Sequence, residues 1–457
     1  MTEFSSLGLS ERILHSVAAA GYTSATPIQA AAIPAVLEGH DIMGLAQTGT
    51  GKTAAFGLPL IEKLLANPQR PFPKSVRALI LAPTRELANQ ITTNLKGYVK
   101  RSKLQIATVV GGQSINVQMR DLGPGKDILV ATPGRLIDLM ERGAIILAQT
   151  HFLVLDEADQ MLDLGFIHSL KRIAKALPKE RQTLLFSATM PAEIESLSKT
   201  YLNDPVRIEV SPAGKTADKI DQSVHFVSQR AKADLLKKHL SERDNDLSLV
   251  FARTKHGAEK LMKHLVSHGF EAASIHGNKS QGQRDRAIRE FRAGNVRILV
   301  ATDVAARGID IPGVSHVYNF DLPQVPESYV HRIGRTARAG AEGRAISFCS
   351  EEETKMLRDI EKLTGVSLTI ASGEHPGFGA GARKDNRGKR GQSSGRPQGE
   401  KRSDPSADNQ NRTKRPHRGK RPQSAAQPSR SRDEGASAAP GRSAKPKWRR
   451  NRKSRAA

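Results

Sequence analysis

The chain has 457 residues and a formal net charge of +25, and its length allows two or three globular domains. The charge is uneven, since residues 381–457 hold 24 Lys and Arg against 6 Asp and Glu, which predicts a polyanionic partner such as nucleic acid. A lone cysteine, Cys349, excludes an internal disulfide, and the lack of a long apolar run predicts a cytoplasmic protein with no membrane partner.

Short apolar runs, separated by helix-like segments, organise the first half of the chain. They are rich in Leu, Ile and Val and do not alternate with polar residues, as is typical of strands buried on both faces of a sheet. The pattern predicts a parallel sheet with helices on both faces. The runs span residues 41–46, 76–83, 127–133, 151–156 and 182–189.

The same rhythm returns in the second half, after a polar stretch that contains Pro and Gly. This second set of runs spans residues 247–254, 271–277, 296–303, 314–321 and 343–350. Beyond about residue 375, Gly, Ser, Pro and basic residues dominate, and such a composition buries too little apolar surface to fold. We predict a first α/β domain over 1–208, a linker over 209–217, a second α/β domain over 218–370 and a disordered basic tail over 371–457.

Residues 46–53 read AQTGTGKT and follow the first apolar run. A glycine-rich turn between a strand and a helix can cradle phosphates, with Lys52 as the cation and Thr53 as the hydroxyl that binds Mg²⁺. The strict pattern of such loops begins with Gly, where this chain has Ala46. The alternative is an ordinary strand–turn–helix loop. We assign ATP binding to the whole stretch, namely Ala46, Gln47, Thr48, Gly49, Thr50, Gly51, Lys52 and Thr53.

Residues 153–159 read LVLDEAD, so a buried-looking strand ends in three carboxylates. Unpaired charges in an apolar setting cost free energy, so they need a cation, a proton-transfer task or a basic partner. We assign Asp156 to Mg²⁺ and Glu157 to the water that attacks in line with the phosphate. Asp159 is left for another partner, in the second domain or at residues 187–189. The alternative is a solvated acidic turn.

At this point the chain resembles the DEAD-box ATP-dependent RNA helicases of superfamily 2. The resemblance covers nearly all of residues 1–370, and its short N-terminal lead and basic tail look most like the bacterial RhlE-like subgroup. It implies two tandem RecA-like domains, each a parallel sheet flanked by helices. The segments that carry it, besides the two above, span residues 21–29, 83–90, 111–112, 132–135, 187–189, 249–255, 276–277, 281–284, 301–310 and 331–340.

The resemblance implies further ATP-site and coupling residues. Gln29 would read the adenine edge, Phe4 would pack on the base and Asp303 would meet the ribose. Arg335 and Arg338 resemble arginine fingers, and their spacing of three predicts a shared helix face from which both reach the γ-phosphate. The usual Gly of this motif is Ala337 here, and the Pro often found in the Gln29 motif is Ala25. Coupling of the ATP state to RNA binding would fall to Ser187, Ala188, Thr189 and His331.

The resemblance also implies an RNA surface that contacts phosphates and 2′-hydroxyls. Hydroxyls, glycine N–H groups, helix N-termini and arginines are suitable partners for phosphate oxygens. The first domain would supply Pro83, Thr84, Arg85, Gly112, Thr132 and Arg135. The second domain would supply Arg253, Gly277, Thr302, Arg307 and Gly308.

We therefore predict an ATP-dependent RNA helicase that uses ATP and Mg²⁺. RNA-stimulated hydrolysis would drive local unwinding of short duplexes or remodelling of RNA–protein complexes, such as ribosomal precursors or RNA-decay complexes, with little regard to sequence. Two other classes remain open. A DNA helicase or translocase shares the phosphate-site logic, and a non-enzymatic RNA-binding protein could act through the basic tail alone. The intact set Lys52, Asp156, Glu157 and Arg335 argues against the second.

Overall fold

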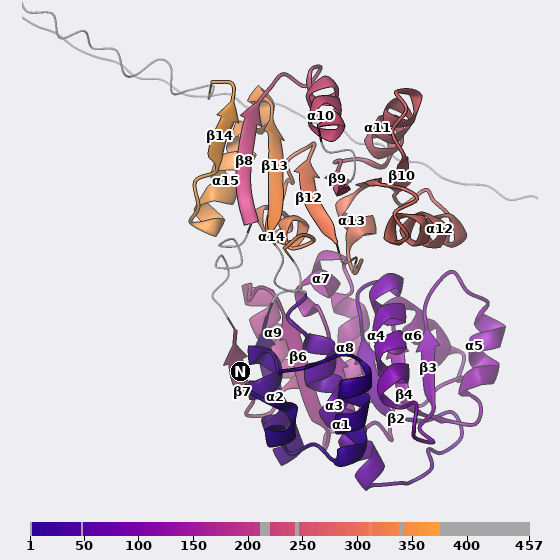
Figure 1. Cartoon of the computed structure of the whole chain (residues 1–457). Coiled ribbons are helices and arrows are strands. Elements are labelled where there is room, and N and C mark those ends of the chain that lie inside the picture. Colours follow the sequence, from indigo (N-terminus) through magenta and orange to yellow (C-terminus); the bar gives the residue numbers. More distant parts are fainter. Residues whose placement is uncertain are drawn as a thin grey trace, which may run out of the picture. The chain divides into compact units, whose positions relative to one another are not determined.

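The computed structural model describes residues 2–46, 49–210, 220–242, 246–309, 311, 313–337 and 342–374, all within one compact unit, Met1–Lys384. Most of the predicted tail lies outside the described residues, since only 371–374 of it are described, and so do Gln47, Thr48, Arg338 and most of the predicted linker. Two parallel sheets of seven strands each, flanked by helices, form the fold (Figure 1). Across the described residues, no helix combines the length and the apolar character needed to span a bilayer.

The first sheet has the strand order β3-β4-β2-β5-β6-β1-β7, and every neighbouring pair is parallel. Parallel strands need crossover connections, which the helices between them supply. The strands are β1 Ile42–Leu45, β2 Val76–Leu81, β3 Ile106–Val109, β4 Lys126–Ala131, β5 Phe152–Leu155, β6 Gln182–Ser187 and β7 Val206–Glu209.

Each central strand of this sheet contributes to two separate cores. In β2, Ala78 and Ile80 pack into the core on one face, whereas Leu79 and Leu81 pack into the core on the other. Burial on both faces explains why the sequence shows uninterrupted apolar runs. The covering elements are the 3₁₀ helix η1 Phe4–Leu7 and α1 Glu11–Ala19, α2 Pro27–Glu38, α3 Lys52–Ala66, α4 Arg85–Tyr98, α5 Ile115–Leu122, α6 Pro133–Glu141, α7 Ala158–Asp163, α8 Ile167–Ala176 and α9 Ala192–Tyr201.

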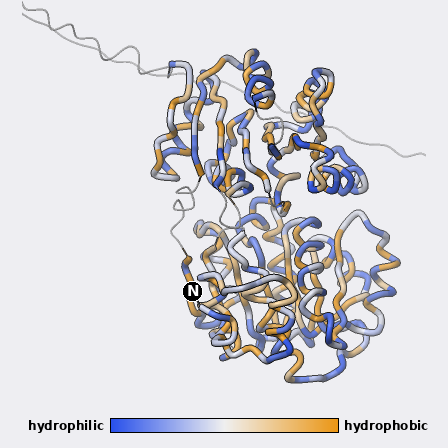
Figure 2. Tube along the Cα trace, viewed as in Figure 1, coloured by the Kyte–Doolittle hydropathy of each residue, from blue (hydrophilic) through white to orange (hydrophobic). Residues whose placement is uncertain are grey.

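The second sheet has the order β10-β11-β9-β12-β13-β8-β14. Its strands are β8 Ile220–Phe226, β9 Leu247–Phe251, β10 Ala272–Ile275, β11 Ile298–Ala301, β12 Val314–Asn319, β13 Gly343–Cys349 and β14 Thr369–Ser372. Its helices are α10 Lys232–Ser241, α11 Lys255–Ser267, α12 Gln281–Arg292, α13 Asp303–Ala306, α14 Pro326–Ile333, the 3₁₀ helix η4 Glu351–Glu353, and α15 Thr354–Thr364. Helix α12 is largely hydrophilic, as its colour in Figure 2 shows, whereas Ala287 and Phe291 form its buried side.

The two sheets have the same strand order, strand for strand. In this order β10, β11 and β9 take the places of β3, β4 and β2, and β12, β13 and β8 take the places of β5, β6 and β1. In parallel α/β sheets, ligands bind at the carboxyl ends of the strands. The shared order therefore allows each loop of one sheet to be compared with its counterpart in the other.

The predicted fold class is confirmed, with one difference at the edge of each sheet. Strand β7 lies at the predicted end of the first domain and reaches the first linker residue, and β14 lies at the predicted end of the second domain; the sequence pattern predicted neither strand. Only Ile208 of β7 is buried, and all of β14 is exposed, so neither strand carries the apolar signal of a central one. Strand β14 also crosses the boundary expected at residue 370. The division into four segments stays a prediction.

Candidate nucleotide and RNA sites

The loop after β1 leads directly into helix α3, which begins at Lys52. Gly49 and Gly51 have φ values of 85° and 91°, in the left-handed region that glycine adopts without strain. A Cβ on Gly51 would collide with the side-chain amide of Gln29, so the loop is closed at that point to any larger residue. Thr53 is the second residue of the helix. The predicted strand–loop–helix arrangement for phosphate binding is present.

Lys52 is buried and lies between the end of β1 and the end of β5. Its Nζ donates to the carbonyl of Ala46 at 3.1 Å and lies 3.8 Å from Oδ1 of Asp156. With these two partners among the described residues, an ammonium group that has three donors can also donate to another anion. This is the position that the sequence predicted for a phosphate-binding cation.

Asp156 and Glu157 are buried directly after β5, at 2% and 3% exposure. Oδ1 of Asp156 and Oε2 of Glu157 have no hydrogen-bond partner among the described residues. Burial raises the pKa of both carboxyls, and the nearby Lys52 ammonium opposes this rise. Glu157 also has a φ of 54°, a strained value for a non-glycine residue that is common at functional sites. Two buried carboxylate oxygens without donors fit a divalent cation and a proton-transfer task.

Asp159 has the partners that the sequence left open. Its Oδ2 accepts from the backbone N–H groups of Ala188 and Thr189 at 3.0 Å each, and from the Thr189 hydroxyl at 3.1 Å. Nε2 of His331 lies 3.9 Å from the same oxygen. Ser187 donates its hydroxyl to the carbonyl of Thr189 at 2.7 Å. The four predicted coupling residues therefore gather around one carboxylate that follows the Asp156–Glu157 pair.

Gln29 joins the start of α2 to the phosphate loop. Its Oε1 accepts from the backbone N–H of Thr26 at 3.0 Å, and its Nε2 donates to the carbonyl of Gly51 at 3.1 Å. The predicted adenine reader is thus also a helix cap. Phe4 is 4% exposed and stacks with Tyr22 at a centroid distance of 6.1 Å, so it belongs to the first domain's core as well.

Arg335 does not lie on the helix that the sequence predicted for it. Helix α14 ends at Ile333, and Arg335 follows in a turn, where its Nη1 donates to the carbonyl of Ile309 at 2.7 Å. The shared helix face expected for Arg335 and Arg338 is therefore wrong for Arg335, because Gly334 ends the helix. The Arg335 charge still acts on the first domain's acids, since it lowers the pKa of Glu157 against the effect of burial.

Asp303 has a partner that the sequence analysis missed. Arg332, on α14, donates from Nε and Nη2 to the two Asp303 oxygens at 2.5 and 2.8 Å. Arg332 is 2% exposed and also donates to the side chain of Asn319. Nothing in the local pattern separates Arg332 from its neighbours, because its partners lie on other elements, at the start of α13 and at the end of β12. The Asp303 side chain, which was predicted to contact the ribose, is thus held in place by a buried arginine.

The predicted RNA residues of the first domain lie in the loops and first helical turns that follow three adjacent strands. Gly112 follows β3, Thr132 and Arg135 follow β4, and Pro83, Thr84 and Arg85 follow β2. Thr84 caps α4 by accepting from the N–H of Leu87, and Thr132 is the N-cap residue of α6. Arg135 donates to the carbonyl of Gln113 at 3.1 Å, which ties two of these loops together.

The second domain repeats this arrangement on the equivalent strands. Gly277 follows β10, Thr302, Arg307 and Gly308 follow β11, and Arg253 follows β9. Arg307 pairs with Asp163 at 2.7 Å, and Arg85 of the first domain donates to Gln281 at 3.4 Å. Each domain therefore presents the predicted RNA groups at the carboxyl ends of its three corresponding strands.

Two family models match the chain. Residues 26–197 match the DEAD/DEAH box helicase model, and residues 231–340 match the helicase conserved C-terminal domain. Together they cover the phosphate loop, the Asp156–Glu157 pair and the loops after β9, β10, β11 and β12.

The similarity to curated proteins is high. The DEAD-box ATP-dependent RNA helicase CshA of Bacillus cereus is 46% identical over 364 residues, which cover 80% of this chain and 68% of that protein. The ATP-dependent RNA helicase CshA of Listeria monocytogenes is 47% identical over 364 residues, with coverage of 80% and 69%.

Solved structures are similar as well. The S. cerevisiae Dbp5 structure with RNA and ADP BeF3 aligns with a TM-score of 0.71 and 33% identity, over 81% of this chain and 96% of that one. The Mss116p structure with ssRNA and AMP-PNP aligns with a TM-score of 0.72 and 30% identity, over 81% and 78%. The predicted family and fold are thereby confirmed, and the chain belongs to the DEAD-box family of ATP-dependent RNA helicases.

Proposed function

We propose that ATP is hydrolysed at the corner formed by Lys52, Asp156 and Glu157, and that RNA backbone binds along the loops after β3, β4, β2 and their counterparts. The observation that supports this most is a pair of buried carboxylate oxygens that have no donor among the described residues and lie beside a buried ammonium group. Left as they are, these charges are costly, and a metal-bound triphosphate would satisfy all three groups.

The roles follow from the position of each group. Lys52 would donate to phosphate oxygens, while Asp156 and the Thr53 hydroxyl would hold Mg²⁺, partly through water. The ion would neutralise charge on the phosphate oxygens and thereby favour attack. Glu157 would orient the attacking water and accept its proton, and burial helps because it raises the pKa of that carboxyl. Arg335 would stabilise the charge that develops on the transferred phosphoryl group.

Coupling to RNA would run through Asp159. This carboxylate holds the backbone of Ala188 and Thr189 and lies beside His331, two residues after Glu157. A change at the phosphates would therefore pass through Asp159 to Ala188 and Thr189 of the first domain and to His331 of the second. Each ligand would favour a closed arrangement to the extent that it binds that arrangement more tightly.

RNA is the partner that this arrangement of residues supports best. The similar Dbp5 and Mss116p structures contain RNA, and the loops that follow β3, β4 and β2 here carry hydroxyls, glycines and arginines. Such groups bind phosphates and 2′-hydroxyls without reading base edges. The substrate would be structured or duplex RNA, within ribosomal precursors or RNA-decay complexes, in the cytoplasm.

The subgroup is a finer matter. The sequence predicted an RhlE-like protein from its short lead and its tail, yet the curated relatives described above are named CshA and give that prediction no support. The similarity favours a CshA-like protein over its conserved core. The tail, as a sequence-tolerant RNA tether, stays a prediction.

The test is the RNA-stimulated ATPase rate of Lys52→Ala, with the exposed Lys199→Ala as the control for the loss of a lysine. We expect Lys52→Ala to lose hydrolysis and Lys199→Ala to keep it, with RNA and not DNA of equal length as the activator. Near-normal turnover of Lys52→Ala would refute the site, and equal activation by DNA would favour the DNA helicase alternative.

A further inference from the structure

The second sheet carries a lysine–aspartate pair at the place that corresponds to the nucleotide site. Lys232 is the first residue of α10 after β8, as Lys52 is the first residue of α3 after β1. Asp321 follows β12, as Asp156 follows β5. The ammonium–carboxylate distances are 3.7 Å for Lys232–Asp321 and 3.8 Å for Lys52–Asp156. Because the strand orders match, these two corners are equivalent.

The loop in front of Lys232, however, cannot cradle a phosphate. Residues 227–231 read VSQRA and contain no glycine, and Ala231 has a right-handed conformation with φ −87° where Gly51 has φ 91°. A glycine-free loop of this kind does not turn its N–H groups inward on an anion as a phosphate loop does. The second corner therefore keeps the cation of a nucleotide site without the cradle.

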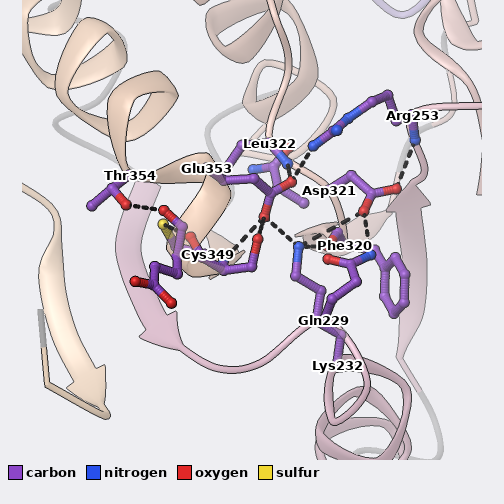
Figure 3. Close-up of polar contacts among 12 residues, drawn as sticks. Gln229, Lys232, Arg253, Phe320, Asp321, Leu322, Cys349, Glu353 and Thr354 are labelled. Atoms are coloured by element: carbon purple, nitrogen blue, oxygen red, sulfur yellow. Dashed lines mark hydrogen bonds and ion pairs between the residues drawn. The ribbon is translucent and has the colours of Figure 1, made fainter. Parts of the chain in front are cut away.

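Glu353 supplies the missing anion from within the chain. It ends the 3₁₀ helix η4, just after β13, and its Oε2 lies 2.5 Å from Nζ of Lys232 (Figure 3). Lys232 is 0% exposed and Glu353 is 1% exposed, and Lys232 also donates to the carbonyl of Phe320 at 2.8 Å. With Glu353 and Asp321 both at this buried ammonium group, no room is left there for an anion from outside the chain.

Both oxygens of Glu353 are fully engaged. Oε2 also accepts from the N–H and the hydroxyl of Ser350, each at 3.1 Å. Oε1 accepts from the N–H of Leu322 at 3.2 Å and from Nη2 of Arg253 at 2.5 Å. The first domain offers the opposite case, since its buried carboxylates keep oxygens without donors. These contacts hold the Glu353 carboxylate in one orientation, with Oε1 directed at Arg253.

Arg253 is the one exposed member of this group that the sequence assigned to RNA. Its backbone N–H donates to Oδ2 of Asp321 at 2.9 Å, and its side chain is 36% exposed. Figure 3 shows Arg253 held at its backbone by Asp321 and at its guanidinium end near Glu353. An arginine that is already fixed loses less side-chain freedom when it binds a phosphate.

We propose that the Lys232–Glu353 pair is an internally filled counterpart of the nucleotide site, and that Glu353 is a positioning residue that holds the Arg253 guanidinium for an RNA phosphate. The proposal rests on the RNA role proposed above for Arg253. Lys232 fixes the carboxylate, and the carboxylate fixes the arginine, so the corner that binds nucleotide in one domain serves RNA binding in the other.

The test compares three full-length variants: Arg253→Ala, the double variant K232M/E353L, and the triple variant that combines them. The double variant replaces the buried pair with apolar side chains of similar volume, which proteins commonly tolerate. The readouts are the RNA concentration for half-maximal ATPase activation, its dependence on salt, and kcat at saturating RNA.

We expect Arg253→Ala and K232M/E353L each to raise the half-activating RNA concentration about tenfold, the usual scale for one charge-assisted hydrogen bond. Each should lower the slope of log affinity against log salt by about 0.7, as loss of one single-strand phosphate contact does. The triple variant should lose no more than either parent, because both changes remove the same contact. The kcat at saturating RNA checks that each variant still hydrolyses ATP.

The outcomes separate the two proposals. If Arg253→Ala keeps the wild-type slope, the RNA role of Arg253 is wrong. If Arg253→Ala lowers the slope and K232M/E353L does not, the pair is merely structural and the positioning role is overturned. Should thermal unfolding show that K232M/E353L does not fold, Glu353→Asp keeps the charge beside Lys232 but shortens its reach to Arg253. That variant should give the same tenfold loss, and a wild-type slope there overturns the role as well.

Discussion

The corners at Lys52 and Lys232 occupy equivalent places in two sheets of one strand order, yet they treat their charges in opposite ways. At Lys52, two buried acids each keep an oxygen without a donor in the described part of the chain, and the loop before the helix has two glycines with positive φ. At Lys232, Glu353 fills the corner and every oxygen of that carboxylate has a donor. The comparison indicates that such a corner can bind a ligand only where the fold leaves its buried charged groups without partners from the chain itself.

We call the corner at Lys52 the open corner and the corner at Lys232 the filled corner. The largest effect should come from removing Arg335, which the second domain contributes to the open corner. Arg335→Ala should lower RNA-stimulated kcat by roughly 10³–10⁵-fold, the range for removal of an arginine finger, while ATP binding persists. Single-turnover hydrolysis with bound ATP quantified separately would measure this. Arg344→Ala, an exposed arginine on β13, is the control and should match wild type. Unchanged turnover in Arg335→Ala would remove this residue from the open corner.

Replacing each lysine alone should mainly lower stability at the Lys232 corner and mainly abolish hydrolysis at the Lys52 corner. Lys232→Met leaves Glu353 buried without its main partner, which should cost about 3–5 kcal/mol of unfolding free energy. Lys52→Met removes a cation from a site built for ligand, so its unfolding free energy should fall much less although hydrolysis is lost. Denaturant unfolding of both variants without nucleotide makes the comparison. Equal losses of stability would contradict the distinction between open and filled corners.

The pH dependence of stability should show the same contrast. Burial holds the pKa of Glu157 above its unfolded value, so the protonated carboxyl stabilises the nucleotide-free fold at low pH, and this contribution is lost as pH rises through the folded pKa. Glu157→Gln should therefore be more stable than wild type at pH 8, and the difference should shrink as pH falls toward 5. A pH series of thermal unfolding tests this, and a difference that does not vary with pH would argue against the raised pKa.

The smallest expected effect concerns Ala337, beside Arg335. Its φ of 56° lies in the left-handed region, where a side chain costs roughly 1–2 kcal/mol. Ala337→Gly, which restores the residue usual in the family, should stabilise the protein by about 1 kcal/mol, reduced by the greater freedom of glycine in the unfolded chain. Ala231→Gly, at a right-handed position, is the matched control and should destabilise. A loss of stability in Ala337→Gly would contradict the strain.

The central strands and the nucleotide-site motifs could be predicted from the sequence, because each is marked by residues that are close together in the chain. Both-face burial made the central strands visible as apolar runs, and the phosphate loop and the DEAD stretch each fit within eight residues. Edge strands β7 and β14 were missed, because exposed strands lack that signal. The Lys232–Glu353 pair joins residues 121 positions apart, and Arg332 meets Asp303 across 29. Only the strand order brings such partners together.

The central claim is that one corner of this molecule binds nucleotide and its counterpart is closed by Glu353. Equilibrium titration of full-length protein with a fluorescent ATP analogue and Mg²⁺ tests it most directly, on wild type, Lys52→Ala and K232M/E353L. We predict one bound nucleotide per chain for wild type and for K232M/E353L, and a loss of binding of at least about tenfold for Lys52→Ala, the usual scale for a charge-assisted contact. Two bound nucleotides in wild type, or unchanged binding by Lys52→Ala, would contradict it.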